Sequence, residues 1–148
     1  MLSVADVMTP KHRLVLTGPG STVREARRAM EANGIRHLPV VDRGRLVGLV
    51  SWTDILVASA GLAVRTGEIM VRHVDTIDPR ANVRHAAMRM HRHRRSCLPV
   101  VRDGKLLGII TDSDFVGIAI ALMEQMEDVE PEPDPGEALP RVAERAIA

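Results

Sequence analysis

Two short motifs in this sequence combine a glycine, a hydroxyl and a carboxylate at one spacing. Their members are Gly48, Ser51 and Asp54 in the first motif and Gly108, Thr111 and Asp114 in the second. A hydroxyl three residues ahead of a carboxyl is the pattern of a capping box, in which both side chains satisfy free backbone N–H groups at the start of a helix. The same place suits a nucleotide, because a helix N-terminus attracts phosphate and a carboxylate accepts both hydroxyl protons of a ribose. The motif by itself leaves both interpretations open.

The two motifs are parts of one long internal repeat. The Leu-Pro-Val-Val segment Leu38–Val41 returns 60 positions later as Leu98–Val101. Other residues recur at the same offset without a gap, namely Val23, Arg24, Ala26, Met30, Gly44, Leu46 and Asp54. Two copies of this length favour two similar half-domains with a duplicated site. Each copy alone is near the lower limit for burying a core, so we expect the copies to share an interface.

Each copy is predicted to have the order β-α-β-β-α, which makes the fold class α+β with two pseudo-symmetric repeats packed through their sheets. The first copy has an extended segment Leu14–Thr17, a helix capped at Ser21 or Thr22 and ended by Asn33-Gly34, a hairpin of strands 38–41 and 46–50, and a helix from Thr53 to about Ala60. The second copy has Val74–Ile77, a helix capped by Asn82, strands 98–101 and 106–110, and a helix from Ser113 to about Met126. We place the repeats at residues 1–62 and 63–126. An acidic, proline-rich tail follows at 127–148, where residues 139–147 can form a short helix.

The composition argues against several classes of protein. No apolar run approaches the roughly 20 residues that a membrane-spanning helix needs, and the N-terminus lacks the pattern of a signal peptide. The single cysteine, Cys97, excludes an intrachain disulfide framework and fits a reducing compartment, so we expect a cytoplasmic protein. Trp52 and Phe115 are the only aromatic residues, which argues against a protein that stacks single-stranded nucleic acid on aromatic side chains.

The duplicated element order, the Leu-Pro-Val-Val strand and the Gly-x-x-Ser/Thr-x-x-Asp motif together resemble a tandem pair of CBS domains, a family named after cystathionine β-synthase. Asp6–Thr9 is similar to the usual opening of that family, while the second opening, Glu68–Val71, has Val in place of Thr. The resemblance covers about Ser3 to Met123. It implies clefts between the two domains that bind an adenosine-containing ligand: AMP, ADP, ATP, NAD or S-adenosylmethionine. No effector domain accompanies the repeats, which resembles the stand-alone members.

The resemblance also assigns roles to residues. Asp54 and Asp114 would hold the ribose, Ser51 and Thr111 would contact phosphate, and the two motif glycines would allow close backbone approach. The other expected ligand contacts lie at the starts of the Leu-Pro strands and in the extended segments: Arg36, His37, Pro39, Ser96, Cys97, Pro99, Leu16, Thr17, Thr76 and Ile77. The strand starts would face the adenine and its phosphates, partly through backbone groups. The extended segments would supply apolar contact to the base.

Charge is unevenly placed along the chain. Seven arginines and no acid lie between Arg80 and Arg102, and seven acids and no base lie between Glu124 and Glu137. The cluster 89–95 has three interpretations. It is a solvated helix face, or a phosphate clamp through Arg94 and Arg95 that favours a longer phosphate chain near the second motif, or a nucleic-acid patch. We further hypothesise that the acidic tail lies over the basic helix and competes with phosphate-bearing ligands at low salt.

The remaining candidates do not indicate other chemistry. His85, His91, His93 and Cys97 do not match a zinc-binding spacing, so no metal site is predicted. No acid–base pair or activated nucleophile indicates an enzyme. We therefore predict a non-enzymatic, homodimeric regulatory module with no obligatory cofactor, which binds an adenine nucleotide and signals to an effector protein by a shift in packing. The alternative is a structural or nucleic-acid interaction protein with empty clefts that uses the basic helix 84–95.

Overall fold

The computed structural model describes residues 1–58 and 64–127. The chain divides into two units, Met1–Phe115 and Val116–Ala148, and the first unit contains the clefts described below. The predicted acidic tail lies outside the described residues except for Glu127, as does the predicted helix end at Ala60. Within the described residues, no helix is long and apolar enough to cross a membrane.

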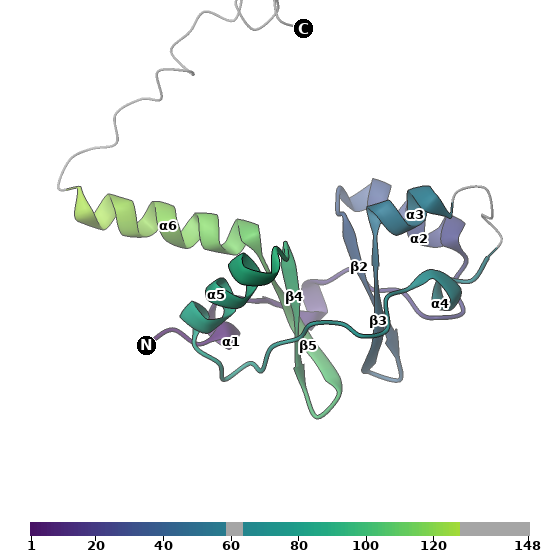
Figure 1. The fold of residues 1–148 in the computed structure, drawn as a ribbon, viewed down its shortest axis with the longest axis horizontal. Coiled ribbons are helices and arrows are strands. Elements are labelled where there is room, and N and C mark those ends of the chain that lie inside the picture. The colour runs from purple at the N-terminus through teal and green to yellow at the C-terminus, as the bar shows by residue number, and fades with distance from the viewer. Residues whose placement is uncertain (59–63, 128–148) are drawn as a thin grey trace, which may run out of the picture. The chain divides into compact units, whose positions relative to one another are not determined.

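Both repeats fold as a helix, a β-hairpin and a second helix (Figure 1). The first repeat consists of α2 (Val23–Asn33), β2 (His37–Asp42), β3 (Arg45–Ser51) and α3 (Trp52–Val57). The second consists of α5 (Val83–His93), β4 (Cys97–Arg102), β5 (Lys105–Thr111) and α6 (Asp112–Met126). The extended segments expected ahead of each first helix contribute only single parallel bridges, Thr17 with Val40 and Ile77 with Val100. The predicted α+β class is confirmed.

Local sequence explains where the first helices begin and end. Thr22 accepts a hydrogen bond from the Glu25 N–H at 3.1 Å, and α2 ends on Gly34 in the left-handed region at φ 62°. Asn82 accepts from the Arg84 N–H at 2.8 Å at the start of α5. The equivalent of Gly34 after α5 is Arg94, which adopts the same left-handed conformation at φ 53° despite its side chain.

The hairpins are antiparallel and turn at residues with positive φ. Arg43 and Gly44 have φ 51° and 79°, and Asp103 and Gly104 have φ 52° and 78°. Two consecutive positive φ values are the mark of the tight turn whose twist matches that of the flanking strands. The two hairpins join near these turns, where Arg45 pairs with Lys105 and β3 and β5 become neighbours in one sheet.

A short segment precedes each repeat and packs on the other repeat. The N-terminal segment contains α1 (Val4–Val7), β1 (Thr9–Pro10) and the short 3₁₀ helix η1 (Lys11–Arg13), and β1 pairs with β5 of the second repeat. The segment before the second repeat contains α4 (Thr66–Ile69), and its Val71 pairs with Leu49 of β3 in the first repeat. Figure 1 shows α1 beside α5 and β5, and α4 beside β3. The leading segments are therefore exchanged between the repeats.

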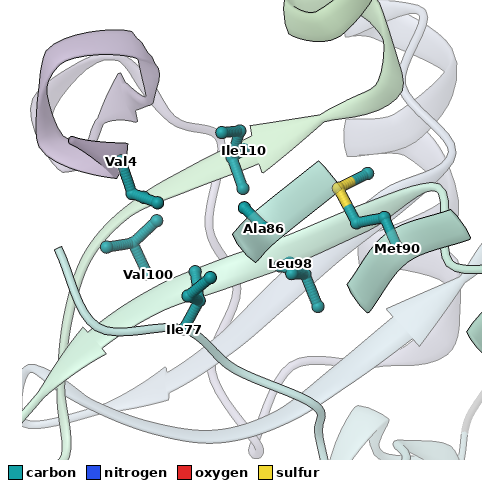
Figure 2. Close-up of a cluster of buried hydrophobic side chains, with 7 residues drawn as sticks. All are labelled: Val4, Ile77, Ala86, Met90, Leu98, Val100 and Ile110. Carbon is teal, nitrogen blue, oxygen red and sulfur yellow. The ribbon is translucent and has the colours of Figure 1, made fainter. Parts of the chain in front are cut away.

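The hydrophobic cores follow this exchange. The core of the second repeat consists of Ile77, Ala86, Met90, Leu98, Val100 and Ile110, together with Val4 from the N-terminal segment (Figure 2). The core of the first repeat consists of Val23, Ala26, Met30, Leu38, Val40, Val50 and Ile55, and Val64, Ile69 and Met70 pack against it. Val4 is fully buried, so the second repeat loses part of its core without the first residues of the chain.

Matching backbone hydrogen bonds hold the exchanged segments. Val4 N–H donates to the Ala81 carbonyl at 2.8 Å, and Val83 N–H donates to the Leu2 carbonyl at 3.1 Å. Thr66 N–H donates to the Ser21 carbonyl at 2.6 Å, as the equivalent bond on the first repeat. The N-terminal segment and the second repeat are thus joined by the same kind of hydrogen bond as the Thr66 segment and the first repeat.

The two motif glycines make room for the exchanged segments. A Cβ atom on Gly108 would lie 2.5 Å from the backbone oxygen of Thr9 and 2.7 Å from the sulfur of Met8. A Cβ atom on Gly48 would overlap the Met70 side chain and lie 3.0 Å from the Val71 oxygen. The sequence analysis expected these glycines to let a ligand approach, whereas the group that approaches each of them in the structure is the leading segment of the other repeat.

We predict that Gly108→Ala destabilises the fold by about 1–3 kcal/mol, which is the usual cost of overpacking. Gly48→Ala should cost less, because its nearest neighbours are atoms of the flexible Met70 side chain rather than backbone. Urea unfolding followed by circular dichroism measures both. Gly20→Ala is the matched control, since nothing lies within 4 Å of its Cβ position. Equal stabilities of the Gly108 and Gly20 variants would contradict the packing role of Gly108.

Candidate functional site

Two clefts lie between the repeats, and each combines the motif of one repeat with the strand start of the other. The larger, the Thr111 cleft, has a volume of about 440 Å³. Its lining comes from both repeats: Thr9, Arg13, Leu14, Val15, Ile35, Arg36, His37 and Pro39 from the first, and Ser96, Cys97, Ile109, Thr111, Asp112 and Ser113 from the second. This volume is within the range of about 300–1,000 Å³ that is usual for small-molecule sites.

The smaller cleft, the Ser51 cleft, is its pseudo-symmetric counterpart with a volume of about 200 Å³. It is lined by His37, Leu49, Ser51 and Asp54 of the first repeat, and by Val71, His73, Val74, Asp75, Arg95 and Cys97. His37 and Cys97 line both clefts. They occupy equivalent positions, 60 residues apart, at the starts of β2 and β4.

Both motif carboxylates accept the backbone N–H of the motif hydroxyl residue, and the first motif also forms the second hydrogen bond of a capping box. Ser51 N–H donates to Asp54 Oδ2 at 2.9 Å, and Asp54 N–H donates to Ser51 Oγ at 3.2 Å. Thr111 N–H donates to Asp114 Oδ2 at 2.8 Å, and the Thr111 hydroxyl donates to the same oxygen at 3.3 Å. These bonds leave the second oxygen of each carboxylate able to accept from a ligand. The capping and binding interpretations are therefore compatible.

The walls of the two clefts differ in character. The Thr111 cleft has an apolar wall to which Leu14, Val15, Ile35, Pro39 and Ile109 contribute, and its charged residues are Arg13, Arg36 and one acid, Asp112. In the Ser51 cleft, two carboxylates, Asp54 and Asp75, lie with Arg95 and His73. A flat apolar group together with an anionic group suits the first cleft better than the second.

The structure brings together part of the predicted site. Arg36, His37, Pro39, Ser96, Cys97 and Thr111 line the Thr111 cleft, and His37, Ser51, Asp54, Arg95 and Cys97 line the Ser51 cleft. Asp114 is held against Thr111 but does not itself line the cleft. The other predicted residues line neither of these clefts: Gly48, Gly108, Arg94, Pro99, Leu16, Thr17, Thr76 and Ile77.

The extended segments contact the clefts one or two residues earlier than expected. Ile77 is 4% exposed and belongs to the second core, and Thr17 pairs with Val40. The lining positions are instead Leu14 and Val15 in one segment and Val74 and Asp75 in the other.

The structure does not place Arg94 and Arg95 in the cleft of the second motif, where the sequence analysis expected them. Arg95 lines the cleft of Ser51, because each motif faces the strand start of the opposite repeat, and Arg94 lines neither cleft. The arginines that share a cleft with Thr111 are Arg13 and Arg36. Arg13 follows β1 in the exchanged N-terminal segment, and no motif in the sequence marks it.

Burial changes the acidity of the two residues that line both clefts. Burial lowers the pKa of His37, against the opposing influence of Asp112 and Asp54, so the imidazole is held neutral at neutral pH. Its Nε2 lies 3.4 Å from the Ser96 hydroxyl. Burial also raises the pKa of the Cys97 thiol to about 11. Within residues 1–58 and 64–127, no group of three metal-ligating side chains comes together.

Comparison with known proteins matches this geometry to one family. The family model of the CBS domain matches residues 4–61 and 67–120. Among solved structures, the Vibrio cholerae protein AcuB, assigned to acetoin utilization, has a TM-score of 0.78 at 40% identity, covering 88% of this chain and 99% of that one. CBSX2 of Arabidopsis thaliana, solved in complex with AMP, has a TM-score of 0.76 at 29% identity, covering 83% and 99%. The CBS domain pair of MJ0100, solved with 5'-methylthioadenosine and S-adenosyl-L-methionine, has a TM-score of 0.71 at 30% identity, covering 82% and 98%.

Several curated relatives of this chain are much longer proteins. The homoserine O-acetyltransferase of Methanococcoides burtonii is 41% identical over 115 residues, which are 76% of this chain and 23% of the relative. This chain spans about a quarter of the length of such relatives.

The raised pKa of Cys97 predicts a slow reaction with thiol reagents. A thiol with a pKa near 11 is about one part in a thousand thiolate at pH 8, and the thiolate is the reactive form. Modification by Ellman's reagent at pH 8 should therefore be at least about 100-fold slower in the folded protein than in urea. It should accelerate as the pH rises toward 11. Because Cys97 is the single cysteine, the signal has one source. Equal rates in folded and unfolded protein would show that burial does not protect the thiol.

Proposed function

Because this chain belongs to the CBS-domain family, we propose that it is a regulatory module that binds an adenosine-containing ligand in the Thr111 cleft. The observation that carries the proposal is the composition of that cleft, in which an apolar wall, two arginines and the motif residue Thr111 surround about 440 Å³. The proposed role is binding and regulation rather than catalysis.

Each part of the ligand has a matching part of the cleft. The adenine would lie against the apolar side chains of Val15, Ile35 and Pro39, where burial of its faces is favourable. The free oxygen of Asp114, together with Thr111, would accept from the ribose hydroxyls. A phosphate would lie toward Arg13 and Arg36, whose guanidinium groups can bind it in a bidentate manner.

The ligands of the similar structures support an adenosine compound. CBSX2 was solved with AMP, and MJ0100 with S-adenosyl-L-methionine and 5'-methylthioadenosine. These molecules share adenosine and differ in what is attached to its 5' carbon. The apolar wall and the motif would account for the shared part, so selectivity for the attached group would come from Arg13 and Arg36, which line the same cleft.

Signalling would follow from the position of the cleft between repeats. A ligand that contacts Val15 and Ile35 of the first repeat and Thr111 of the second repeat favours the packing in which both contacts are made. A partner protein that distinguishes the two packings would then sense the ligand. A homodimer and an effector protein complete the proposed assembly.

The exposed face of α5 supports a second candidate function, the binding of a nucleic acid. Arg84, His85, Arg92 and His93 are all exposed on this helix. Nucleic-acid binding by such a face depends on counterion release and falls steeply with salt. Binding in the Thr111 cleft should depend on Asp114 and leave α5 free, so salt titrations of binding separate the two functions.

We expect at least one of AMP, ADP, ATP, NAD and S-adenosylmethionine to raise the thermal stability of the protein. At one hundred times its dissociation constant, a ligand stabilises the fold by about 2.7 kcal/mol. Asp114→Asn should lose this stabilisation, because Asn can still accept from the Thr111 N–H but carries no charge for the ribose hydroxyls. Differential scanning fluorimetry and calorimetry measure both effects. If none of the five compounds stabilises the protein, the proposed function is wrong.

The phosphate position predicts a selective effect of one arginine. Arg13→Gln should lower the affinity for ATP by about 10-fold or more, as expected for loss of a hydrogen bond to a charged group. The affinity for adenosine should change little. Arg94→Gln is the matched control, because Arg94 lies outside both clefts. Calorimetric titrations of ATP and adenosine into the wild type and the two variants give the ratio of the two dissociation constants for each protein. A uniform loss for both ligands in Arg13→Gln would place the phosphate elsewhere.

A further inference from the structure

The two clefts are built on equivalent backbone but differ at several lining positions, two of which are occupied by Val15 and Ile35 in one cleft and by Asp75 and Arg95 in the other. Ile35 N–H donates to the Met30 carbonyl at 3.1 Å, and Arg95 N–H donates to the Met90 carbonyl at 2.9 Å, so Ile35 and Arg95 are structural equivalents. Val15 and Asp75 are equivalent in the same way. Each lies two residues before a residue, Thr17 or Ile77, whose N–H donates at 3.0 Å to the carbonyl of the proline in the adjacent strand.

At these two positions the Thr111 cleft has the apolar residues Val15 and Ile35, whereas the Ser51 cleft has the charged residues Asp75 and Arg95. Val15 and Ile35 pack against the first core and line the Thr111 cleft. Arg95 Nε lies 3.9 Å from Asp75 Oδ2 in the Ser51 cleft. The same carboxylate oxygen lies 3.2 Å from Nδ1 of His93. The Asp75 side chain is only 26% exposed, so these contacts hold its carboxylate at the cleft wall.

This difference acts directly on the part of the cleft that would receive a base. In the Thr111 cleft, a base at this wall covers apolar side chains. In the Ser51 cleft, a base in the equivalent place would have to cover a carboxylate and a guanidinium group and deprive both of water, which is costly. The volumes agree, since the Ser51 cleft has about 200 Å³ and is below the usual range for small-molecule sites, whereas the Thr111 cleft has about 440 Å³.

We infer that Asp75 and Arg95 close the Ser51 cleft to adenosine compounds, so that this protein has one adenosine site although it has two complete motifs. The inference rests on the proposed function and adds to it the residues that decide which cleft is used. The Ser51 and Asp54 pair then acts only as a helix cap. Selectivity between the clefts lies in the wall rather than in the motif.

The test is a gain of binding. AMP and S-adenosylmethionine are titrated separately by calorimetry into the wild type, the double variant Asp75→Val/Arg95→Ile, Asp54→Asn and Asp114→Asn. The wild type should bind one molecule per chain of whichever compound binds. Asp114→Asn should weaken this binding about 10- to 100-fold, and Asp54→Asn should leave it unchanged. The double variant should bind two molecules per chain.

Each outcome of these titrations either supports or overturns the inference. A wild type that binds two molecules, or that loses affinity equally in both Asn variants, overturns the inference while leaving the proposed function intact. A folded double variant that still binds one molecule shows that Asp75 and Arg95 are not what closes the cleft. If circular dichroism shows that the double variant does not fold, the wild-type stoichiometry and the two Asn variants decide alone. A wild type that binds neither compound fails the proposed function itself.

Discussion

The packing of each leading segment on the opposite repeat is the contact on which the rest of the structure depends. Val4 is fully buried among Ala86, Val100 and Ile110, although it is separated from them by the whole first repeat. Val64 and Ile69 make the reverse contact with the first core. A single repeat is too short to bury a stable core unaided, so each borrows apolar surface from the other. The two exchanged segments thereby connect the repeats on either side of the clefts.

The Gly-x-x-Ser/Thr-x-x-Asp motif serves this packing before it serves any ligand. Its glycine lets the other repeat's leading segment approach the strand, and its carboxylate accepts a backbone N–H at the start of the following helix. These roles are filled in both repeats, whether or not a ligand binds there. An intact motif is therefore explained by the packing alone and does not show that a ligand occupies the cleft. What separates the two clefts chemically are positions such as 15 and 75, which lie outside the motif.

Local features were predictable from the sequence, and the exchange of segments was not. The turns at Gly44 and Gly104, the caps at Thr22 and Asn82 and the end of α2 at Gly34 depend on neighbouring residues, so the sequence pattern contains them. The repeat in the sequence is the same whether a leading segment packs on its own repeat or on the other one. For that reason the sequence analysis expected Arg95 beside the second motif and did not single out Arg13. The site could be predicted as a set of elements, but the pairing of elements across the two repeats required the structure.

The loss of stability caused by a substitution differs between the residues that join the two repeats, which form the frame of the fold, and the residues of the cleft walls. Gly108 and Val4 lie where the N-terminal segment packs on the second repeat, so a change there disturbs a contact that joins the two repeats. Arg95 is 56% exposed on its side chain, and changes at such positions usually alter stability by less than about 0.5 kcal/mol. The walls of the two clefts can therefore differ in charge and volume while the frame around them stays the same. A duplicated fold of this kind keeps two symmetric clefts as a consequence of packing, and it can restrict ligand binding to one of them through a few wall residues.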